Sequence, residues 1–305
     1  MQDSYDAAVT KDDTVAEFDG QNRSLLDRFQ HFLHGNPAMV PVIILIASIA
    51  IFGIVAGERF FSAFTLGLIM QQVAIVGILA CAQTLIILTA GIDLSVGAVM
   101  VLSYVVMGTL GVSMGWPTPL AILAGILIGM GCGAINGLLV TKLKLPPFIV
   151  TLGTWRIFLA TVFLYTGSQS IRSQDIAAEA PGLKFFGNKV TASDDLVGFN
   201  ANVTYGVILM LLIFAVFWYV LTRTAWGRAV YAVGDDKEAA ELAGIRSDRI
   251  LLSVYTTAGF ICGLAAWAAI GRVGSVSPSS FAEANLESIA AVVLGGPALY
   301  GGRGE

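Results

Sequence analysis

Long runs of apolar residues, separated by short polar segments, dominate the chain after its first 37 residues. A membrane-spanning helix needs roughly 20 apolar residues in a row. Seven runs approach or exceed that length, and they cover residues 38–57, 66–90, 94–111, 120–140, 148–166, 203–221 and 250–270. An eighth run, 288–300, is too short for an upright span and predicts a re-entrant or broken helix.

The unbroken apolar runs exclude a membrane β-barrel, because barrel strands alternate apolar and polar residues over about 10 positions. The pattern therefore predicts an all-α polytopic membrane protein with about eight membrane segments. A polar tail, residues 1–37, precedes a transmembrane domain, residues 38–305. The sequence stops at a glycine-rich turn, Gly301–Glu305, directly after the eighth run, and we expect that further C-terminal spans are missing.

Composition supports the membrane prediction. Hydrophobic residues make up 56% of the chain, charged residues make up 12%, and the mean hydropathy is +0.79. Soluble domains carry about 25% charged residues, and residues 94–141 contain no Asp, Glu, Lys or Arg. These values exclude a soluble enzyme, a secreted disulfide scaffold and a disordered chain. The net charge of −4 comes from the acidic tail, and no basic cluster suggests nucleic acid.

Reactive and ligand-binding side chains are scarce. The three cysteines lie inside apolar runs, where a thiol is ordinarily a small hydrophobic group. We therefore expect neither a disulfide nor a metal site. The sequence has no catalytic triad, and it lacks the Gly-x-x-x-x-Gly-Lys-Ser/Thr loop that cradles ATP phosphates. We predict that the chain is not an enzyme and binds no cofactor of its own.

The distribution of Lys and Arg predicts the orientation, because cytoplasmic loops carry an excess of positive charge. With the N-terminus in the cytoplasm, the inner side holds Lys11, Arg23, Arg28, Lys142, Lys144, Arg223, Arg228, Lys237, Arg246 and Arg249. The outer side holds Arg59, Arg172, Lys184 and Lys189. This excess predicts a cytoplasmic N-terminus, an external segment at 167–202 and a cytoplasmic segment at 222–249.

The first candidate for function joins the second and third apolar runs with almost no polar linker. Gly91 and Gly97 loosen the helix there, while Asp93 or Ser95 can cap the following helix by accepting from backbone N–H groups. Transporters use such broken helices to place polar backbone within the bilayer. The alternative is that Asp93 only caps a helix at the cytoplasmic interface.

The second candidate, residues 224–245, lies in the predicted cytoplasmic segment. Residues 235–242 are typical of a short helix, because Asp235 and Asp236 at its start suit the helix dipole and Gly244 suits its end. Its small residues predict an outward face that docks into a partner's cleft, and they are Ala239, Ala240 and Ala243. A solvated loop is the alternative.

Several other polar and small residues lie within the apolar runs. Gly125, Gly129, Gly133 and Gly137 recur every four residues and predict close packing against a neighbouring helix. We expect three glutamines either to line a polar route or to form hydrogen bonds between helices, and they are Gln71, Gln72 and Gln83. Arg156 lies inside the fifth run. Its side chain can snorkel to the interface, pair with an acid or face a cavity, and the sequence leaves all three interpretations possible.

Three motifs carry a resemblance to a known family. Residues 87–98, Ile-Leu-Thr-Ala-Gly-Ile-Asp-Leu-Ser-Val-Gly-Ala, closely resemble the signature of ABC-transporter permeases that import ribose, xylose, galactose or fructose. Residues 227–234 followed by 238–245 resemble the ATPase-coupling loop of that family, and 289–304 resemble its third motif. Their order and spacing make the resemblance specific over residues 38–305.

The resemblance assigns residues to two sites. The coupling loop contains Gly227, Arg228, Tyr231, Gly234, Glu238, Ala239, Ala240 and Gly244. Candidates for the translocation path or a broken helix are Gln71, Gln72, Gln83, Gly91, Asp93, Ser95, Gly97, Arg156, Gly295 and Gly296. Two positions depart from the family. Pro297 stands where Thr is usual, and Arg156 lies one helical turn before Leu159, where the ribose branch carries Arg.

The resemblance also implies an assembly. Two permease subunits, here a homodimer, enclose a sugar path in the lipid of the bacterial inner membrane, and a full-length member has about ten spans. Separate cytoplasmic subunits bind and hydrolyse ATP, and a periplasmic sugar-binding protein delivers the substrate. The run at 171–176 resembles most the rhizobial-type fructose permeases, so fructose is the expected sugar, followed by ribose or xylose.

Two other functions remain open at this stage. A branched-chain amino-acid permease of the ABC type shares the architecture but matches less well across residues 91–97. A secondary transporter needs acidic residues near the middle of the membrane to couple an ion, and the chain offers almost none apart from Asp93.

Overall fold

Seven helices in the part of the chain that the computed structural model describes, residues 39–190 and 203–295, are long and apolar enough to cross a membrane. They are Pro41–Arg59, Ala63–Ile87, Val96–Ser113, Thr118–Lys142, Pro147–Thr166, Tyr205–Arg223 and Ser247–Val273. Each coincides with one predicted run to within a few residues, which confirms the all-α polytopic membrane fold. Helix α13 (Ala284–Leu294) begins four residues before the eighth run and overlaps its first part, and its 11 residues are too few for a span.

The chain divides into two compact units, Met1–Ser48 and Ile49–Glu305. Helix α3 (Met39–Ala56) crosses the boundary between them and leads into the short helix η1 (Gly57–Arg59). The candidate sites all belong to the second unit.

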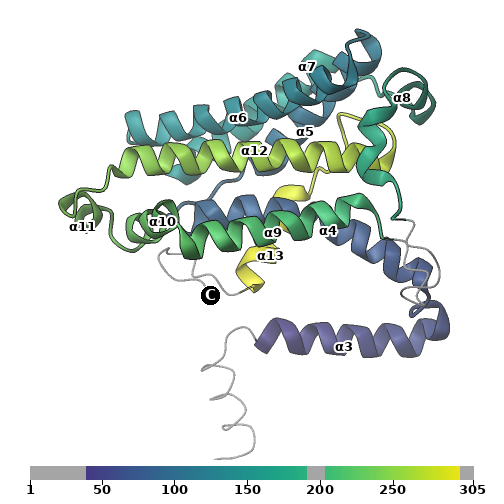
Figure 1. The fold of residues 1–305 in the computed structure, drawn as a ribbon, viewed down its shortest axis with the longest axis horizontal. Coiled ribbons are helices and arrows are strands. Elements are labelled where there is room, and N and C mark those ends of the chain that lie inside the picture. Colours follow the sequence, from purple (N-terminus) through teal and green to yellow (C-terminus); the bar gives the residue numbers. More distant parts are fainter. Residues whose placement is uncertain (1–38, 191–202, 296–305) are drawn as a thin grey trace, which may run out of the picture. The chain divides into compact units, whose positions relative to one another are not determined.

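The second unit is a helical bundle (Figure 1). Its remaining elements are α4 (Ala63–Ile87), α5 (Val96–Gly108), η2 (Thr109–Ser113), α6 (Thr118–Lys142), α7 (Pro147–Thr166), α8 (Ser173–Glu179), η3 (Pro181–Gly187), α9 (Tyr205–Arg223), α10 (Ala225–Asp235), α11 (Lys237–Leu242), α12 (Ser247–Val273) and α13. Among the described residues, β-structure is confined to two isolated bridges, Ile171 with Val276 and Lys189 with Thr204.

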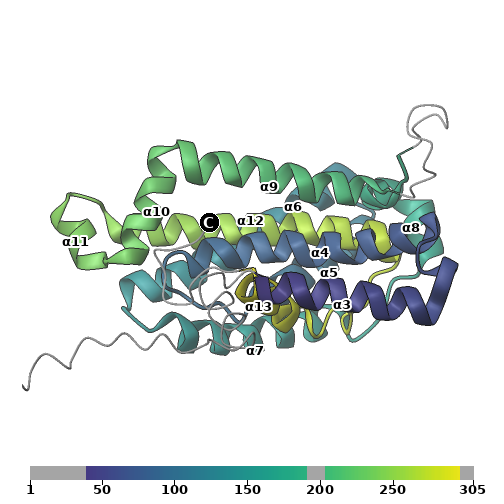
Figure 2. The ribbon, with the colours of Figure 1, turned by 90° about the horizontal axis from the view of Figure 1, so that it is seen from below.

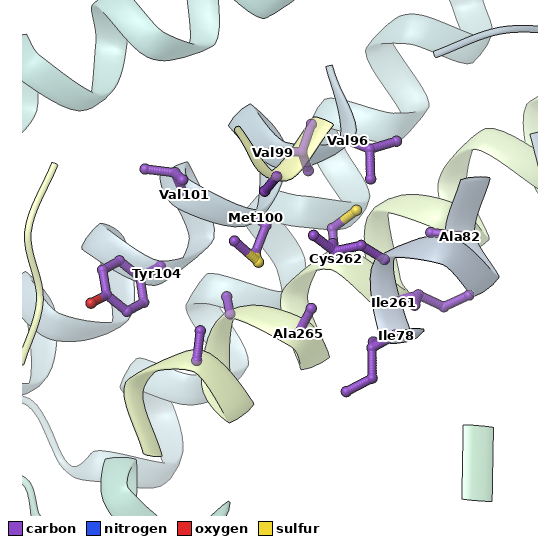
Figure 3. Packing of buried hydrophobic residues seen from close by; sticks show 14 of the residues in the cluster. Ile78, Ala82, Val96, Val99, Met100, Val101, Tyr104, Ile261, Cys262 and Ala265 are labelled. Carbon is purple, nitrogen blue, oxygen red and sulfur yellow. The ribbon is translucent and has the colours of Figure 1, made fainter. Parts of the chain in front are cut away.

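Helix α5 forms the centre of the bundle. All 13 of its residues are buried, as expected of a helix that is apolar on every side. It contacts α4, α6, α7, α12 and α13. Figure 3 shows the core where helices α4, α5 and α12 meet, and Ile78 of α4, Met100 of α5 and Ile261 of α12 all belong to this cluster of buried side chains.

Glycines allow α6 and α12 to pack closely along much of their length (Figure 1). A Cβ atom on Gly129 would lie 2.5 Å from the carbonyl oxygen of Gly259, and one on Gly133 would lie 2.2 Å from that of Tyr255. Cβ atoms essentially never come within 3.0 Å of another heavy atom. The predicted role of the glycine repeat in close helix packing is therefore confirmed at these positions.

The two ends of the bundle carry different short helices. Both views place α10 and α11 at one end and α8 at the other (Figures 1 and 2). Helices α7 and α12 each end at a glycine in the left-handed conformation, Gly167 with φ 56° and Gly274 with φ 74°. Such glycines turn the chain sharply where a span ends.

Candidate functional site

The connection between α4 and α5, residues 88–95, is folded into the protein interior. Thr89, Asp93 and Ser95 are all buried. Gly91 lies against α12, since a Cβ at this position would be 3.2 Å from the hydroxyl oxygen of Tyr255. This close approach favours a residue without a side chain at position 91.

A chain of hydrogen bonds begins at the buried carboxylate of Asp93. Its Oδ1 accepts from both the backbone N–H and the hydroxyl of Ser95, each at 2.6 Å. The Ser95 Oγ in turn accepts from Nδ2 of Asn136 on α6, at 2.8 Å. The hydroxyl of Ser95 thus donates one hydrogen bond and accepts another. Its single proton is used, and one acceptor lone pair is left.

Two other helices hold the same connection. The backbone N–H of Leu94 donates to Oγ1 of Thr151 on α7 at 3.1 Å, and that hydroxyl donates to the carbonyl oxygen of Ile92 at 3.2 Å. On the other side, Oδ1 of Asn285 in α13 accepts from the backbone N–H of Gly97. An N–H group in the first turn of α5 has no partner within its own helix, so Asn285 supplies one.

The partners show how deep the connection lies relative to the neighbouring spans. Asn136 stands six residues before the end of α6, which corresponds to about 9 Å along the helix. Thr151 stands four residues after the start of α7, or about 6 Å. The connection is thus level with the interior of these spans, which favours the broken-helix interpretation over a cap at the interface.

Some buried polar atoms near α5 have no hydrogen-bond partner among the described residues. They are both side-chain polar atoms of Gln83, Oγ of Ser103, Oδ1 of Asn136 and the hydroxyl of Tyr255. Gln83, predicted to line a path or to bond between helices, is fully buried. Gln72 instead lies on an exposed part of α4, where its Oε1 accepts from the guanidinium of Arg272, while Gln71 is half-buried.

Arg156 occupies a different environment. It lies near the middle of α7, is exposed, and its guanidinium carbon is 4.4 Å from the ring centroid of Trp155. Trp155 is half-buried and packs against the hydrophobic core. The described residues show no salt bridge of Arg156 with an acid, so the pairing interpretation finds no partner within this part of the chain.

The second candidate, residues 224–245, consists of two helices rather than one. Helix α10 ends at Asp235, and Asp236 caps α11 by accepting from the backbone N–H groups of Glu238 at 2.9 Å and Ala239 at 3.0 Å. Gly244 follows α11 with φ 86°, as predicted for the helix end. A positive φ of this size favours glycine, because other residues adopt it less readily.

The predicted docking face needs a correction at Ala240. This residue is 4% exposed and packs against Val233 of α10 and Leu251 of α12, so it is not available to a partner. Helix α10, which the sequence analysis missed, supplies the surface that covers it. Ala239 and Ala243 are exposed as predicted.

Of the other residues predicted for the coupling loop, some are buried and others are exposed to solvent. Gly227 lies in the first turn of α10, where a Cβ would be 2.2 Å from the carbonyl oxygen of Leu221. Gly234 is buried, Tyr231 is half-buried, and Arg228 and Glu238 are exposed. At the far end of the chain, Gly295 is exposed directly after α13, while Gly296 lies outside the described residues.

Comparison with known proteins decides the family. Residues 65–302 match the family described as "Branched-chain amino acid transport system / permease component". The chain belongs to this permease family.

Individual relatives of the permease carry sugar names. It is 57% identical to the fructose import permease protein of Rhizobium meliloti over 291 residues, which cover 95% of the chain and 79% of that protein. It is 37% identical to the ribose import permease protein of Bacillus subtilis, over 78% of the chain and 70% of that protein. It is 33% identical to the D-allose transport system permease protein of Escherichia coli, over 86% and 76%. No solved structure matches it.

Sequence reasoning missed three residues that tie the permease's buried connection to its neighbours: Asn136, Thr151 and Asn285. It also missed Leu242, the last residue of α11, which is 91% exposed. Leu242 is the one large apolar side chain of α11, and it points away from the rest of the described protein. The only sequence signal for it was its place as the last residue of the predicted helix 235–242.

Proposed function

We propose that this permease forms the membrane path of an ATP-driven importer for a monosaccharide, with fructose first and ribose or xylose next. The main support is the 57% identity to a fructose import permease over 95% of the chain. The ribose and D-allose permeases among its relatives add to this support, because their named substrates are also monosaccharides.

Two other functions fit less well. The family description names branched-chain amino acids, but the relatives named above transport sugars. A secondary transporter needs an acidic residue that can take up an ion. Asp93 is the one buried acid among the described residues, and its Oδ1 is already engaged by Ser95.

Substrate choice is tested by uptake in a strain that lacks its own monosaccharide importers. The full permease is expressed with the ATP-binding and sugar-binding proteins of the same system, and uptake of labelled fructose is measured. We expect excess unlabelled fructose to compete most strongly, ribose and xylose less strongly, and leucine not at all. Uptake of labelled leucine, with none of labelled fructose, would favour the branched-chain function.

The assembly follows from the same proposal. Two copies of the permease pair in the bacterial inner membrane, surrounded by lipid, with the N-terminus in the cytoplasm. A periplasmic sugar-binding protein docks on the side of segment 167–202. The path runs along the exposed face of α7, where Arg156 lies, and the α4–α5 connection with Asp93 supports the opposite, packed face of that helix.

Energy coupling is assigned to α10 and α11, within the cytoplasmic segment 222–249. We propose that the ATP-binding subunit docks on the exposed side of α11, with Leu242 as an anchor, since Ala240 faces the permease's own core. Docking sites commonly depend on a few large side chains that fill a pocket on the partner. The salt bridge of 3.3 Å between Lys237 and Asp248 links α11 to α12, so a movement of α11 reaches a span directly.

A further inference from the structure

The exposed face of α7 combines a charge with a position far from either helix end. Arg156 is nine residues from Pro147 and ten from Thr166, which corresponds to about 14 and 15 Å along the helix. Long cationic side chains snorkel to the interface only near helix ends. A charged side chain at this depth faces the bundle interior, a partner or a water-filled cavity rather than lipid.

Helix geometry places Arg156 opposite the packed face of α7. The buried residues of the helix recur at spacings of three and four, and they are Val150, Thr151, Thr154, Phe158 and Val162. Arg156 is two positions from both Thr154 and Phe158, which puts it on the other side of a helix with 3.6 residues per turn. The bundle interior of this subunit is therefore not what Arg156 faces.

The surroundings of Arg156 leave room for a small molecule. Gly153 and Ala160 lie one turn before and after it on the same face, and both are exposed. A Cβ on Gly153 would meet nothing within 4 Å. The half-buried ring of Trp155 holds the guanidinium at one side, so the donor groups of Arg156 project from a fixed place beside the open surface at Gly153.

A dry contact between this face and the same face of a second copy is unfavourable. In a symmetric pair, the same surface of both subunits meets, so a contact of α7 with itself would bring two Arg156 side chains together. Helix α7 contains no Asp or Glu that would pair with them. Water or a polar solute between the subunits satisfies both guanidinium groups, whereas a closed apolar interface does not.

We propose that the α7 face centred on Arg156 lines a hydrated part of the translocation path, and that Arg156 donates hydrogen bonds to the hydroxyl oxygens of the passing monosaccharide. Trp155 is a positioning residue that holds the guanidinium in place. This inference rests on the proposed transport of a monosaccharide. The guanidinium has five N–H donors and no acceptor, which suits a neutral polyol rich in acceptor oxygens.

The first test measures whether the face is hydrated. Single cysteines replace Ala160 on α7 and Leu211 on α9, each exposed and six residues from its helix end. A charged, membrane-impermeant methanethiosulfonate reagent is added to the assembled transporter in proteoliposomes. Because the native cysteines are buried, the unsubstituted chain gives the background rate.

We expect Ala160→Cys to react faster than Leu211→Cys, and fructose with its binding protein to slow the reaction at position 160 only. Equal reactivity at the two positions would overturn the hydrated face. Fast reaction without protection by any transported sugar would overturn the sugar contact.

The second test separates transport from assembly. Hydrogen bonds to a charged group are stronger than neutral ones, so we expect Arg156→Gln to lower fructose uptake at saturating binding protein by about tenfold. We expect the ATP-binding subunit to co-purify with Arg156→Gln as it does with the unsubstituted permease, and ATP hydrolysis to be unchanged. Trp155→Leu lowers uptake in the same direction, and Trp155→Phe restores most of it, because an aromatic ring is retained. Leu164→Ala, at an exposed position on the same helix, serves as the control.

Wild-type uptake by Arg156→Gln would overturn the proposal. If that variant does not assemble, Arg156→Lys and the cysteine reactivity at position 160 test the proposal instead. Normal uptake by Arg156→Lys would count against a role for the planar guanidinium. Failure of the proposed function gives a different result: the unsubstituted permease with its partners then imports no monosaccharide, while reactivity at position 160 still reports on hydration.

Discussion

A single methyl group added at Gly133 tests the packing on which the fold depends. Gly133 of α6 faces α12, and a Cβ there would lie 2.2 Å from the carbonyl oxygen of Tyr255 and 3.2 Å from Cα of Gly259. The first contact is with backbone, which has no rotamer to change. The two helices must therefore move apart if Gly133 is replaced by Ala.

Gly131 provides a matched control on the same helix, because it is exposed and a Cβ there would meet nothing within 4 Å. Ala is favoured over Gly within a helix by about 1 kcal/mol, so Gly131→Ala is neutral or slightly stabilising. Overpacking a close contact costs about 1–3 kcal/mol. The gain in helix propensity is common to both variants, so we expect Gly133→Ala to be less stable than Gly131→Ala by about 1–3 kcal/mol.

Thermal unfolding of the two purified variants in the same detergent measures this difference, with the unsubstituted chain alongside. The melting temperature of Gly133→Ala should fall clearly below the other two. Equal melting temperatures for Gly131→Ala and Gly133→Ala would refute the reasoning, because α6 and α12 would then have room for a side chain at their crossing.

Three further predictions address coupling, orientation and the buried connection. Leu242→Asp places a charge at the proposed docking contact and should lower co-purification of the ATP-binding subunit by about tenfold; unchanged co-purification would argue against an anchor there. A cysteine at Asn188 should react with an impermeant maleimide in intact spheroplasts, and one at Glu241 only after permeabilisation; the reverse pattern would invert the topology. Asp93→Ala leaves the buried N–H and hydroxyl of Ser95 without their acceptor and should destabilise the protein by about 1–3 kcal/mol, seen as a lower melting temperature in detergent, whereas an unchanged value would show that this hydrogen bonding is dispensable.

The spans were predictable from sequence because the bilayer sets their length and the chain must bury its backbone groups within it. The close packing of α6 was equally predictable from its glycine repeat, because a spacing of four places small residues on one helix face. Both signals are local. They depend only on residues close together in the sequence, so no tertiary information was needed.

The partners of the α4–α5 connection were not predictable in this way. Ser95 and Asn136 are 41 residues apart, and Gly97 and Asn285 are 188 apart. A single Asn within an apolar helix has the same sequence context whether it faces lipid, a path or another helix. Only the packing of α6 and α13 around α5 distinguishes these possibilities.

The orientation of α11 could not be predicted from the sequence, for a related reason. The alanines at 239, 240 and 243 predicted a small-residue face, but which of them points outward depends on how α10 and α12 enclose the helix. Helix α10 itself was hidden by Gly227 and Gly234, which weaken a helical pattern in sequence. In the structure Gly227 serves the tight turn from α9, where backbone approaches too closely for a side chain.

The central claim is that the permease carries a monosaccharide at the expense of ATP. Its most direct test is uptake of labelled fructose into proteoliposomes that contain the permease and the ATP-binding subunit, with the sugar-binding protein outside and ATP inside. The account predicts accumulation of fructose that requires the permease, the binding protein and hydrolysable ATP together. Fructose uptake driven by an ion gradient without ATP, or ATP-dependent uptake of leucine with none of fructose, would contradict it.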